Sequence, residues 1–496
     1  MVSRRWLLST LLILVPSAVA PARACFTVIV GRDASADGSV LVGHNEQNGG
    51  RQALHFRRVP GRRFDEGAVV RLRRGGTLEQ VPETFSFLWS ELPGQEFSDS
   101  YLNEHGVAVV SNACPTRQDD YAALVARGEI RDGGIGYTLR RLVAQRARSA
   151  REGVLLAAGW VERFGYVHCG RTYVIADTRE AWLLAVAGGR AYVAQRVPDD
   201  AVAVLPNIHI IGVLPDHNSA AWQGIYDYAG GRGWWDPHAG PFNFRKAFRR
   251  DRSDPPDPRR LRGRELVLGR KEPRRAHPAP IGVNPPRTLS VADVAAILRD
   301  RAGRPPLSTP TTQEASVFQL RAGVPPEIGC VWWRTTAEPA VSVFTPWYLG
   351  VLTVPEQYDS PGDLETKLTL DHHFNPPEGT FDRQAPVAWR TFRRLQDVAY
   401  AGGENGIRKL QDEWTAFERK VFAVQPELET KAIEIWEKDP EEARRLLTER
   451  CHDVARDAQR AARKWLDARQ FGSRQEDGGQ ENLLVRHFLV RKSKRE

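Results

Sequence analysis

Cys25 is the residue best placed to do chemistry, because it directly follows a processing pattern of small residues, Ala22-Arg23-Ala24. Cleavage after Ala24 would make Cys25 the first residue of the chain. A cysteine is nucleophilic as its thiolate, and its thiol has an ordinary pKa of about 8.5. A free α-amine has a pKa of about 7.7–8.0 and can accept the thiol proton near neutral pH. The pattern therefore predicts a covalent hydrolase whose nucleophile and base belong to one residue.

Residues 1–24 have the organisation of a secretory signal peptide. Arg4 and Arg5 precede an apolar run at residues 6–20, which polar residues and a proline interrupt and which is too short to span a bilayer stably. We therefore predict a cleaved signal, a secreted or periplasmic protein, and no transmembrane segment in the mature chain. The alternative is a lipid-anchored envelope protein with an acylated Cys25, although Arg23 suits a lipoprotein signal poorly.

The residues after Cys25 predict a β-hairpin that would hold a catalytic terminus in place. Residues 26–31 favour a strand, the Asp-Gly pair at 37–38 is a turn signal, and a second strand begins at Val40. The second strand ends in His-Asn-Glu-Gln at residues 44–47. A terminus that is paired in a hairpin does not fray, which a positioned nucleophile requires.

The stretch that starts at Cys25 resembles the opening of the PepD-type dipeptidases, a cysteine family of the Ntn (N-terminal nucleophile) hydrolases. That opening reads Cys-x-Thr-x-x-Val-Gly-(Lys/Arg)-x-Ala-Ser-x-Asp-Gly-Ser and continues to Arg-Asn-x-Asp. The matching residues are Cys25, Thr27, Val30, Gly31, Arg32, Ala34, Ser35, Asp37, Gly38, Ser39 and Asn45. Further similar segments are residues 142–152, 177–182, 197–200 with Asn207, 233–244, 331–333 and 345–348.

The resemblance implies a fold and an activity. The fold would be α+β, a four-layer α/β/β/α sandwich of antiparallel sheets with a helical C-terminal region. The activity would be cysteine-dependent hydrolysis of dipeptides or short peptides. The nearest enzymatic alternative is an acylase of the same superfamily that acts on N-acyl amides. A non-catalytic envelope lipoprotein is the alternative from a different class.

The resemblance also implies roles for single residues. Asn207 matches the position whose side-chain amide would stabilise the oxyanion, and Asn112 the position whose backbone N–H would be the second donor. Asn45 belongs to the family motif. Glu46 is a candidate replacement for the acid that the family motif contains and this chain lacks. We therefore expect Asn45 and Glu46 to bind substrate.

The chain departs from the family pattern at three positions. His44 replaces an arginine, Gln47 replaces an acid, and Ala185 occupies the place of an expected glutamate. As an imidazolium, His44 would favour the thiolate, so we expect a catalytic role and a loss of kcat/KM as the imidazole deprotonates near its ordinary pKa of about 6.5. A structural histidine is the alternative. The missing acids weaken the expectation of strict dipeptide specificity.

The rest of the sequence offers no second chemistry. His168-Cys169 and His372-His373 lack the spaced partners of a zinc site, and neither a Walker-type glycine loop nor a Gly-x-Ser-x-Gly motif is present. We therefore predict no metal and no cofactor. Four cysteines remain, and the sequence leaves their pairing open: Cys114, Cys169, Cys330 and Cys451.

The composition is that of a globular protein, with 41% hydrophobic and 26% charged residues among 496. The net charge of +9 falls to +6 without the three arginines of the signal segment, which is mild for this length and does not indicate nucleic-acid binding. The expected partner is a small peptide substrate, and a homo-oligomer is compatible with the sequence.

The chain divides into a predicted catalytic domain at residues 25–387 and a helical extension at 388–496 that packs on it. Helices are expected at residues 137–164, 291–301, 389–400, 406–424, 427–438 and 440–469, with a frayed tail from about 475. A stretch rich in proline and arginine, residues 248–287, is expected to be an exposed excursion.

Overall fold

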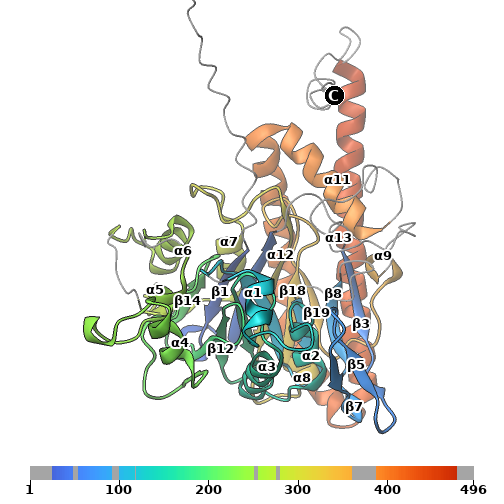
Figure 1. The fold of residues 1–496 in the computed structure, drawn as a ribbon. Helices are drawn as coiled ribbons and strands as arrows, with labels where there is room; N and C mark the ends of the chain where they lie inside the picture. Colours follow the sequence, from blue (N-terminus) through green and yellow to red (C-terminus); the bar gives the residue numbers. More distant parts are fainter. Residues whose placement is uncertain are drawn as a thin grey trace, which may run out of the picture.

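Two large antiparallel sheets lie face to face at the centre of the molecule, and helices cover both outer sides (Figure 1). The structure is a computed structural model that describes residues 25–47, 54–91, 100–117, 119–250, 255–274, 280–359 and 387–476, with the side chains of the final helix described to residue 468. The predicted signal peptide, His372-His373 and nearly all of the tail expected from about 475 lie outside the described residues.

The first sheet holds the start of the described chain in its interior. Its strand order is β16-β14-β1-β2-β17-β18-β19, and each neighbouring pair is antiparallel, so β1 has a partner on both sides. The strands are β1 (Phe26–Val30), β2 (Val40–Gln47), β14 (Val202–Leu205), β16 (Gly282–Val283), β17 (Thr312–Leu320), β18 (Cys330–Arg334) and β19 (Thr345–Tyr348).

The second sheet is also antiparallel and has the order β15-β13-β12-β11-β10-β9-β8-β3. Two small ribbons, β4 with β7 and β5 with β6, complete the strands. The strands are β3 (His55–Val59), β4 (Arg62–Arg63), β5 (Val69–Arg71), β6 (Thr77–Glu79), β7 (Glu83–Thr84), β8 (Phe87–Glu91), β9 (Ser100–Asn103), β10 (Ala108–Ala113), β11 (Arg171–Ala176), β12 (Ala181–Val186), β13 (Tyr192–Arg196) and β15 (Ser219–Ala221).

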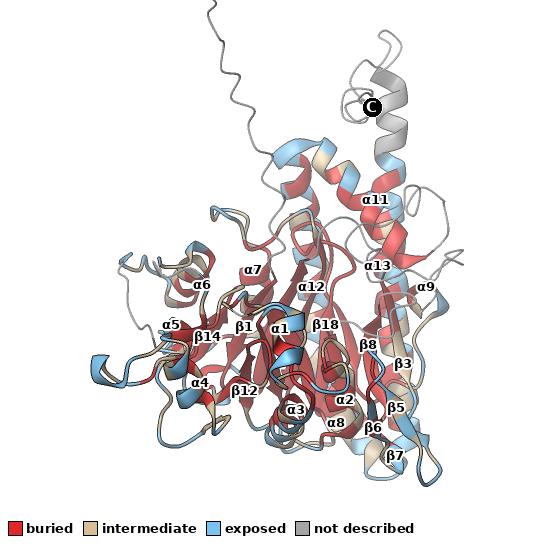
Figure 2. Ribbon diagram, viewed as in Figure 1, coloured by how far each residue is buried: buried red, intermediate tan, exposed pale blue. Residues whose placement is uncertain are grey.

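Alternation along the strands of the second sheet creates two separate apolar faces. In β10, Val109 belongs to the cluster that includes α2 (Thr138–Arg146) and α3 (Ala150–Phe164), whereas Val110 belongs to the cluster shared with the first sheet. Successive side chains of a strand point to opposite faces, so the two sides are covered by different layers. Figure 2 shows the resulting buried interior in red.

The remaining helices complete the architecture. On the first sheet, α7 packs against β2 and β17, α6 against β14, and α13 against β19. The four layers are therefore helices, sheet, sheet and helices, which confirms the predicted α/β/β/α sandwich. The helices are α1 (Tyr121–Ala126), α4 (Ile225–Gly231), α5 (Phe244–Phe248), α6 (Pro258–Leu268), α7 (Val291–Leu298), α8 (Pro326–Gly329), α9 (Glu356–Asp359), α11 (Ala388–Ala401), α12 (Gly403–Trp436) and α13 (Pro440–Glu476), with 3-10 turns η1 (Arg32–Ala34) and η2 (Pro237–Ala239).

The predicted hairpin of β1 and β2 is confirmed, and local signals explain its connection. Asp37 Oδ1 accepts hydrogen bonds from the backbone and hydroxyl of Ser39, and Gly38 adopts a φ of +74°. Gly31 lets the chain pass close to another segment, since a Cβ there would lie 2.4 Å from the carbonyl oxygens of Pro198 and Asp199.

The prediction of an exposed excursion at residues 248–287 is wrong for α6. Asp257 caps this helix by accepting from the backbone N–H groups of Arg259 and Arg260, and a proline occupies its first turn. The side chains of Arg259 and Arg260 are buried. Arginine density indicated solvent, but long arginine stems can pack on apolar surface while their guanidinium groups find acceptors inside the protein.

The helix boundaries differ from the predictions at two further places. The predicted helix at 137–164 is two helices, α2 and α3, because Ser149 caps a new one through its side chain. Conversely, two predicted helices at 406–424 and 427–438 form the single helix α12, which continues through Pro426. A proline inside a helix costs about 3 kcal/mol, and α12 has buried residues both before and after Pro426, among them Val421 and Glu429.

The C-terminal helices share the hydrophobic core of the sheets. Phe422 of α12 lies with its ring centroid 4.5 Å from that of Trp333 in β18, and Cys451 of α13 is fully buried in the same cluster. Two ion pairs also link α12 to the rest of the fold, Arg299 with Glu418 and Arg321 with Glu429.

All five cysteines of the chain are unpaired.

Candidate active site

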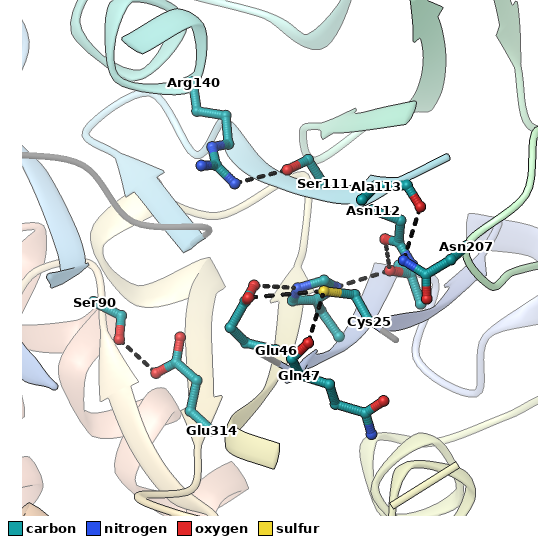
Figure 3. Close-up of polar contacts among 12 residues, drawn as sticks. Cys25, Glu46, Gln47, Ser90, Ser111, Asn112, Ala113, Arg140, Asn207 and Glu314 are labelled. Carbon is teal, nitrogen blue, oxygen red and sulfur yellow. Dashed lines mark hydrogen bonds and ion pairs between the residues drawn. The ribbon is translucent and has the colours of Figure 1, made fainter. Parts of the chain in front are cut away.

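Cys25 lies between the two sheets, directly before β1 and beside the end of β2. Phe26 pairs with Asn45, so the next position outward places Cys25 beside Glu46. The Cys25 Sγ is 3.7 Å from Glu46 Oε1 and 4.0 Å from the carbonyl oxygen of Gln47 (Figure 3). The hairpin therefore brings a thiol and a carboxyl group together in a site where Cys25 is 6% exposed.

The surroundings of Cys25 keep its sulfur protonated. Burial raises the pKa of the thiol to about 12, and the neighbouring carboxyl of Glu46 adds to this increase. The positive charges of Arg171 and Arg259 act in the opposite direction but do not outweigh burial. A nucleophilic thiolate at this position therefore requires a base that removes the proton as the reaction proceeds.

The hydrogen bonds of His44 determine which of its ring nitrogens carries a proton. Asn112 donates through Nδ2 to the Leu205 carbonyl at 3.0 Å, which turns its Oδ1 toward Thr27. The Thr27 hydroxyl donates to Asn112 Oδ1 at 2.6 Å, so it accepts from His44 Nδ1 at 2.8 Å. The other nitrogen, Nε2, then carries a lone pair in the neutral ring and lies 3.3 Å from Glu46 Oε2.

The structure does not support the expected imidazolium at His44. The side chain is fully buried, and burial lowers its pKa to about 3; Glu314 raises this pKa, and Arg140 and Arg171 lower it further. A neutral ring cannot supply the permanent charge of the family's arginine. The loss of kcat/KM expected from imidazolium deprotonation near neutral pH is therefore not expected of this geometry.

Asn112 and Asn207 both lie near Cys25, and their side chains have different partners. The side chain of Asn112 ties β10 of the second sheet to β1 and β14 of the first sheet through its contacts with Thr27 and Leu205. Asn207 Nδ2 donates to the Ala113 carbonyl at 2.8 Å. Figure 3 shows Asn207 close to Asn112 and on the same side of Cys25.

Asn45 does not lie where a substrate-binding residue was expected. Its Nδ2 donates to the carbonyl oxygens of Leu298 and Leu307 at 2.9 and 3.0 Å, and the side chain is fully buried. Because side chains alternate along β2, Asn45 faces α7 whereas His44 and Glu46 face the second sheet. Asn45 therefore anchors β2 to the segment after α7, and only Glu46 of the two predicted substrate-binding residues lies at Cys25.

Arg259 is a site residue that the sequence did not reveal. Its Nη1 lies 3.2 Å from both the Cys25 carbonyl oxygen and Asn207 Oδ1, and its Nη2 donates to Gln47 Oε1 at 3.0 Å. Gln47 in turn donates to Leu307 and Thr312. The one available signal was the Asp-Pro pair at 257–258, which is typical of a helix start and argued against a solvated loop.

Arg140 and Arg171 form a second group of positive charge that the sequence did not reveal. Both donate to the hydroxyl of Ser111, at 2.7 and 2.8 Å, and both are buried. Their guanidinium groups also lie over the ring of Tyr137. They come from α2 and β11, far apart in the sequence, so only the tertiary structure brings them together.

Two other sequence features have no link to Cys25 in the described residues. Ala185 is fully buried in β12, so this chain has no carboxylate where the family pattern expects one. The ring of His168 stacks on Tyr137 with centroids 4.1 Å apart, while Cys169 is exposed. His168 and Cys169 do not appear together in any ligand cluster of the described chain.

Comparison with known proteins identifies the family. The family model described as peptidase family C69 matches residues 24–304, more than half of the chain. The chain belongs to peptidase family C69. It is therefore a peptidase, and the similarity to PepD-type dipeptidases seen in the sequence is confirmed.

Curated relatives agree with the C69 assignment. The chain is 26% identical over 409 residues to a probable dipeptidase of Salmonella dublin, covering 76% of this chain and 90% of that protein. It is 26% identical over 384 residues to a probable dipeptidase of Latilactobacillus sakei, covering 71% of this chain and 79% of that protein.

Solved structures with some similarity include two hydrolases. Penicillin V acylase from Agrobacterium tumefaciens has a TM-score of 0.35 at 11% identity, with coverage of 66% of this chain and 86% of that chain. A conjugated bile acid hydrolase from Clostridium perfringens has a TM-score of 0.33 at 11% identity, with coverage of 66% and 92%. The C69 assignment rests on the sequence matches.

Among the described helices, none combines the length and the apolar character that a membrane span needs.

Proposed function

We propose that this C69 peptidase hydrolyses dipeptides or short peptides with Cys25 as its nucleophile and the Cys25 α-amine as its base. Removal of residues 1–24 would free that amine, and the enzyme would act in a secreted or periplasmic location. The observation that carries the proposal is the position of Cys25, which is held at the start of a central strand between the two sheets, next to Glu46, Arg259 and Asn207.

The proposed reaction has two stages. The α-amine takes the thiol proton as the sulfur attacks the peptide carbonyl, and the carbonyl oxygen becomes an oxyanion. The C–N bond then breaks, the leaving amine receives the proton, and a thioester joins Cys25 to the acyl part. Water hydrolyses this thioester and regenerates the thiol. The buried thiol makes a nearby base necessary, because burial opposes spontaneous formation of the thiolate.

Two features support the proposed roles of Asn207 in oxyanion stabilisation and of the buried arginines in substrate binding. Asn207 Nδ2 donates one hydrogen to the Ala113 carbonyl and carries a second, to which we assign the stabilisation of the oxyanion. The charges of Arg171 and Arg140 suit the free carboxylate of a short peptide, since guanidinium groups bind carboxylates with paired hydrogen bonds. A short peptide has such a terminal carboxylate close to the scissile bond, which favours it over a long chain.

The proposal is tested first by mass spectrometry of the N-terminus of the exported protein. A free Cys25 amine is expected. A diacylglyceryl adduct on Cys25 would contradict Cys25 as nucleophile, because the lipid is bonded to its sulfur, and would favour a lipid anchor. Blocking cleavage with Ala24→Pro should give a folded and inactive precursor, because an amide nitrogen cannot accept the thiol proton. An active uncleaved precursor would exclude the α-amine as base.

Cys25→Ser should abolish most turnover on a dipeptide panel while the melting temperature changes little. A serine hydroxyl keeps the volume and the terminal amine but is a much weaker nucleophile near neutral pH. Cys169→Ser is the matched control, since Cys169 is exposed and should be dispensable. Retained activity in Cys25→Ser would exclude Cys25 as nucleophile. Running the same proteins on N-acyl amides separates a peptidase from an acylase preference.

A further inference from the structure

Three side chains between the sheets bring different metal-ligand atoms together. One ligand atom each from Cys25, His44 and Glu46 lies within 4.8 Å of the other two, and all three residues are buried. The atoms are a thiol sulfur, an imidazole nitrogen and carboxylate oxygens. This combination is the ligand set that Zn²⁺ takes in proteins, where it leaves a fourth position for water or another ligand.

Two separations within the cluster are close to those between the ligand atoms of a zinc ion, and the cluster as a whole lies within 4.8 Å. Tetrahedral bonds of about 2.3 Å to sulfur and about 2.1 Å to nitrogen or oxygen place neighbouring ligand atoms about 3.4–3.6 Å apart. Cys25 Sγ lies 3.7 Å from Glu46 Oε1, and His44 Nε2 lies 3.3 Å from Glu46 Oε2. Glu46 thus presents one oxygen to each of the other two ligands.

The hydrogen bonds behind His44 prepare its Nε2 to bind a cation. Because Thr27 must donate to Asn112, His44 Nδ1 carries the hydrogen that Thr27 accepts, and the Nε2 lone pair faces the Glu46 carboxylate. A lone pair facing a carboxylate oxygen at 3.3 Å is favourable only with a proton or a cation between them. Metal-binding histidines are held in this way, with the distal N–H donated to a fixed acceptor.

We propose that Cys25, His44 and Glu46 form an inhibitory Zn²⁺ site. The ion would bind Cys25 Sγ, His44 Nε2 and the Glu46 carboxylate, and the Cys25 thiol would lose its proton to solvent on binding. A zinc-bound sulfur is a much weaker nucleophile than a free thiolate, because it shares an electron pair with the ion. With Cys25 as the nucleophile proposed above, the ion would therefore inhibit the enzyme reversibly. The ligands are side chains, so the site does not depend on cleavage after Ala24 or on any turnover.

The surrounding charges set a limit on how strongly the cation is held. The positive charges of Arg171 and Arg259 interact with Cys25, and that of Arg140 interacts with Glu46. These charges would repel a bare cation. The thiolate and the carboxylate together neutralise the two charges of Zn²⁺, whereas the carboxylate of Glu314 on the side of His44 is already paired with Arg334. We therefore expect a site that zinc occupies reversibly and that a chelator empties.

The test is zinc binding to the whole chain after treatment with a chelator. Calorimetry should show one equivalent of Zn²⁺, and Co²⁺ in its place should give a thiolate-to-cobalt charge-transfer band. Both signals should disappear in Cys25→Ser. Thr27→Val, which keeps the shape but removes the acceptor for His44, should weaken Zn²⁺ binding about 10–100-fold. Cys169→Ser should bind as the unmodified chain does, because Cys169 is outside the cluster.

Alkylation supplies a readout that needs no variant. Because burial makes the Cys25 thiol slow to react, iodoacetamide is applied until Cys25 is alkylated in the metal-free chain. Under the same exposure Zn²⁺ should protect Cys25, as measured on the peptide that contains it, while the exposed Cys169 reacts equally with and without zinc. Absence of zinc binding, or unchanged binding in Cys25→Ser, would overturn the proposal and leave a proton between His44 and Glu46. These measurements need no substrate, so they remain decisive even if the proposed peptidase mechanism fails.

Discussion

Arg259 joins three of the groups around Cys25. One guanidinium group contacts the Cys25 carbonyl, the Asn207 amide oxygen and the Gln47 amide oxygen. Burial lowers its pKa to about 10, so it remains charged under physiological conditions. This residue therefore holds the start of β1, the candidate oxyanion donor and the end of β2 in one arrangement.

Arg259→Lys should reduce kcat by up to about 100-fold, because an ammonium group cannot reach three acceptors in the planar geometry of a guanidinium group. Steady-state kinetics on a dipeptide measure the change. Arg260→Lys is the matched control: Arg260 is its buried neighbour on the same helix and donates to the Pro280 carbonyl rather than to the residues around Cys25. A similar loss of kcat in both variants would assign Arg259 a purely structural role.

At the scale of the element, helix α6 positions Arg259. Asp257 accepts from two backbone N–H groups in the first turn, which is where Arg259 and Arg260 lie. Gly263 of the same helix packs so closely that a Cβ would lie 2.7 Å from the Phe26 ring. The cap and this close contact fix the helix against β1, and with it the direction of Arg259.

Asp257→Ala should lower the free energy of unfolding by about 1 kcal/mol, which is typical of a lost N-cap. It should also lower kcat, by less than Arg259→Lys does, because the first turn that carries Arg259 loosens. Asp120→Ala removes the equivalent cap of α1, which holds no site residue, and should lower stability alone. Denaturant unfolding and kinetics on both variants distinguish the two effects; an unchanged kcat in Asp257→Ala would contradict the role of α6 in positioning Arg259.

At the scale of the whole molecule, the C-terminal helices are joined to the sheets by buried charge as well as apolar packing. Glu418 of α12 accepts from both terminal nitrogens of Arg299 and from the backbone N–H of Phe344. Arg299 directly follows α7, which packs on β2. The helical region therefore supports the strand that carries His44 and Glu46.

Glu418→Gln should lower the free energy of unfolding by about 3–5 kcal/mol, because it leaves the Arg299 charge buried without its partner. Glu404→Gln breaks the neighbouring ion pair with Arg301, in which Glu404 is 84% exposed, and should cost less than about 1 kcal/mol. Denaturant titration of the two variants tests this. Equal losses would mean that the Arg299 pair is effectively solvated.

Buried neutral histidines should make the protein labile to acid. Burial lowers the pKa of His55, His168 and His209 to about 3, whereas the unfolded chain takes up these protons near pKa 6.5. Between these values the unfolded state binds more protons, so stability is full above about pH 6.5 and falls as the pH decreases toward about 3. Each histidine contributes a slope of about 1.4 kcal/mol per pH unit.

His209→Gln isolates one of these contributions. The side chain is buried beside Thr172. Its removal should therefore reduce the slope of unfolding free energy against pH by the contribution of one histidine, about 1.4 kcal/mol per pH unit, between pH 6.5 and about 3. Urea titrations at several pH values measure the slope. A slope identical to that of the unmodified chain would show that His209 is charged in the folded state.

The sequence alone determined the features that local patterns encode. The resemblance to the PepD-type dipeptidases predicted the layered fold. The Asp-Gly turn and the strand of residues 26–31 placed Cys25 at the start of a hairpin. Such turn and strand signals depend on residues close together in the sequence. Local backbone geometry and the period of the side chains are therefore enough to predict these elements.

Only the tertiary structure decided which distant side chains meet Cys25 and what their charges are. Arg259 follows Cys25 by more than 200 positions, Arg171 comes from β11 of the second sheet and Arg140 from helix α2, and none of their contacts follows from local spacing. Burial between the sheets made His44 neutral where sequence reasoning expected an imidazolium. Ionisation depends on the water and charges around a group, and packing of residues far apart in the chain sets both.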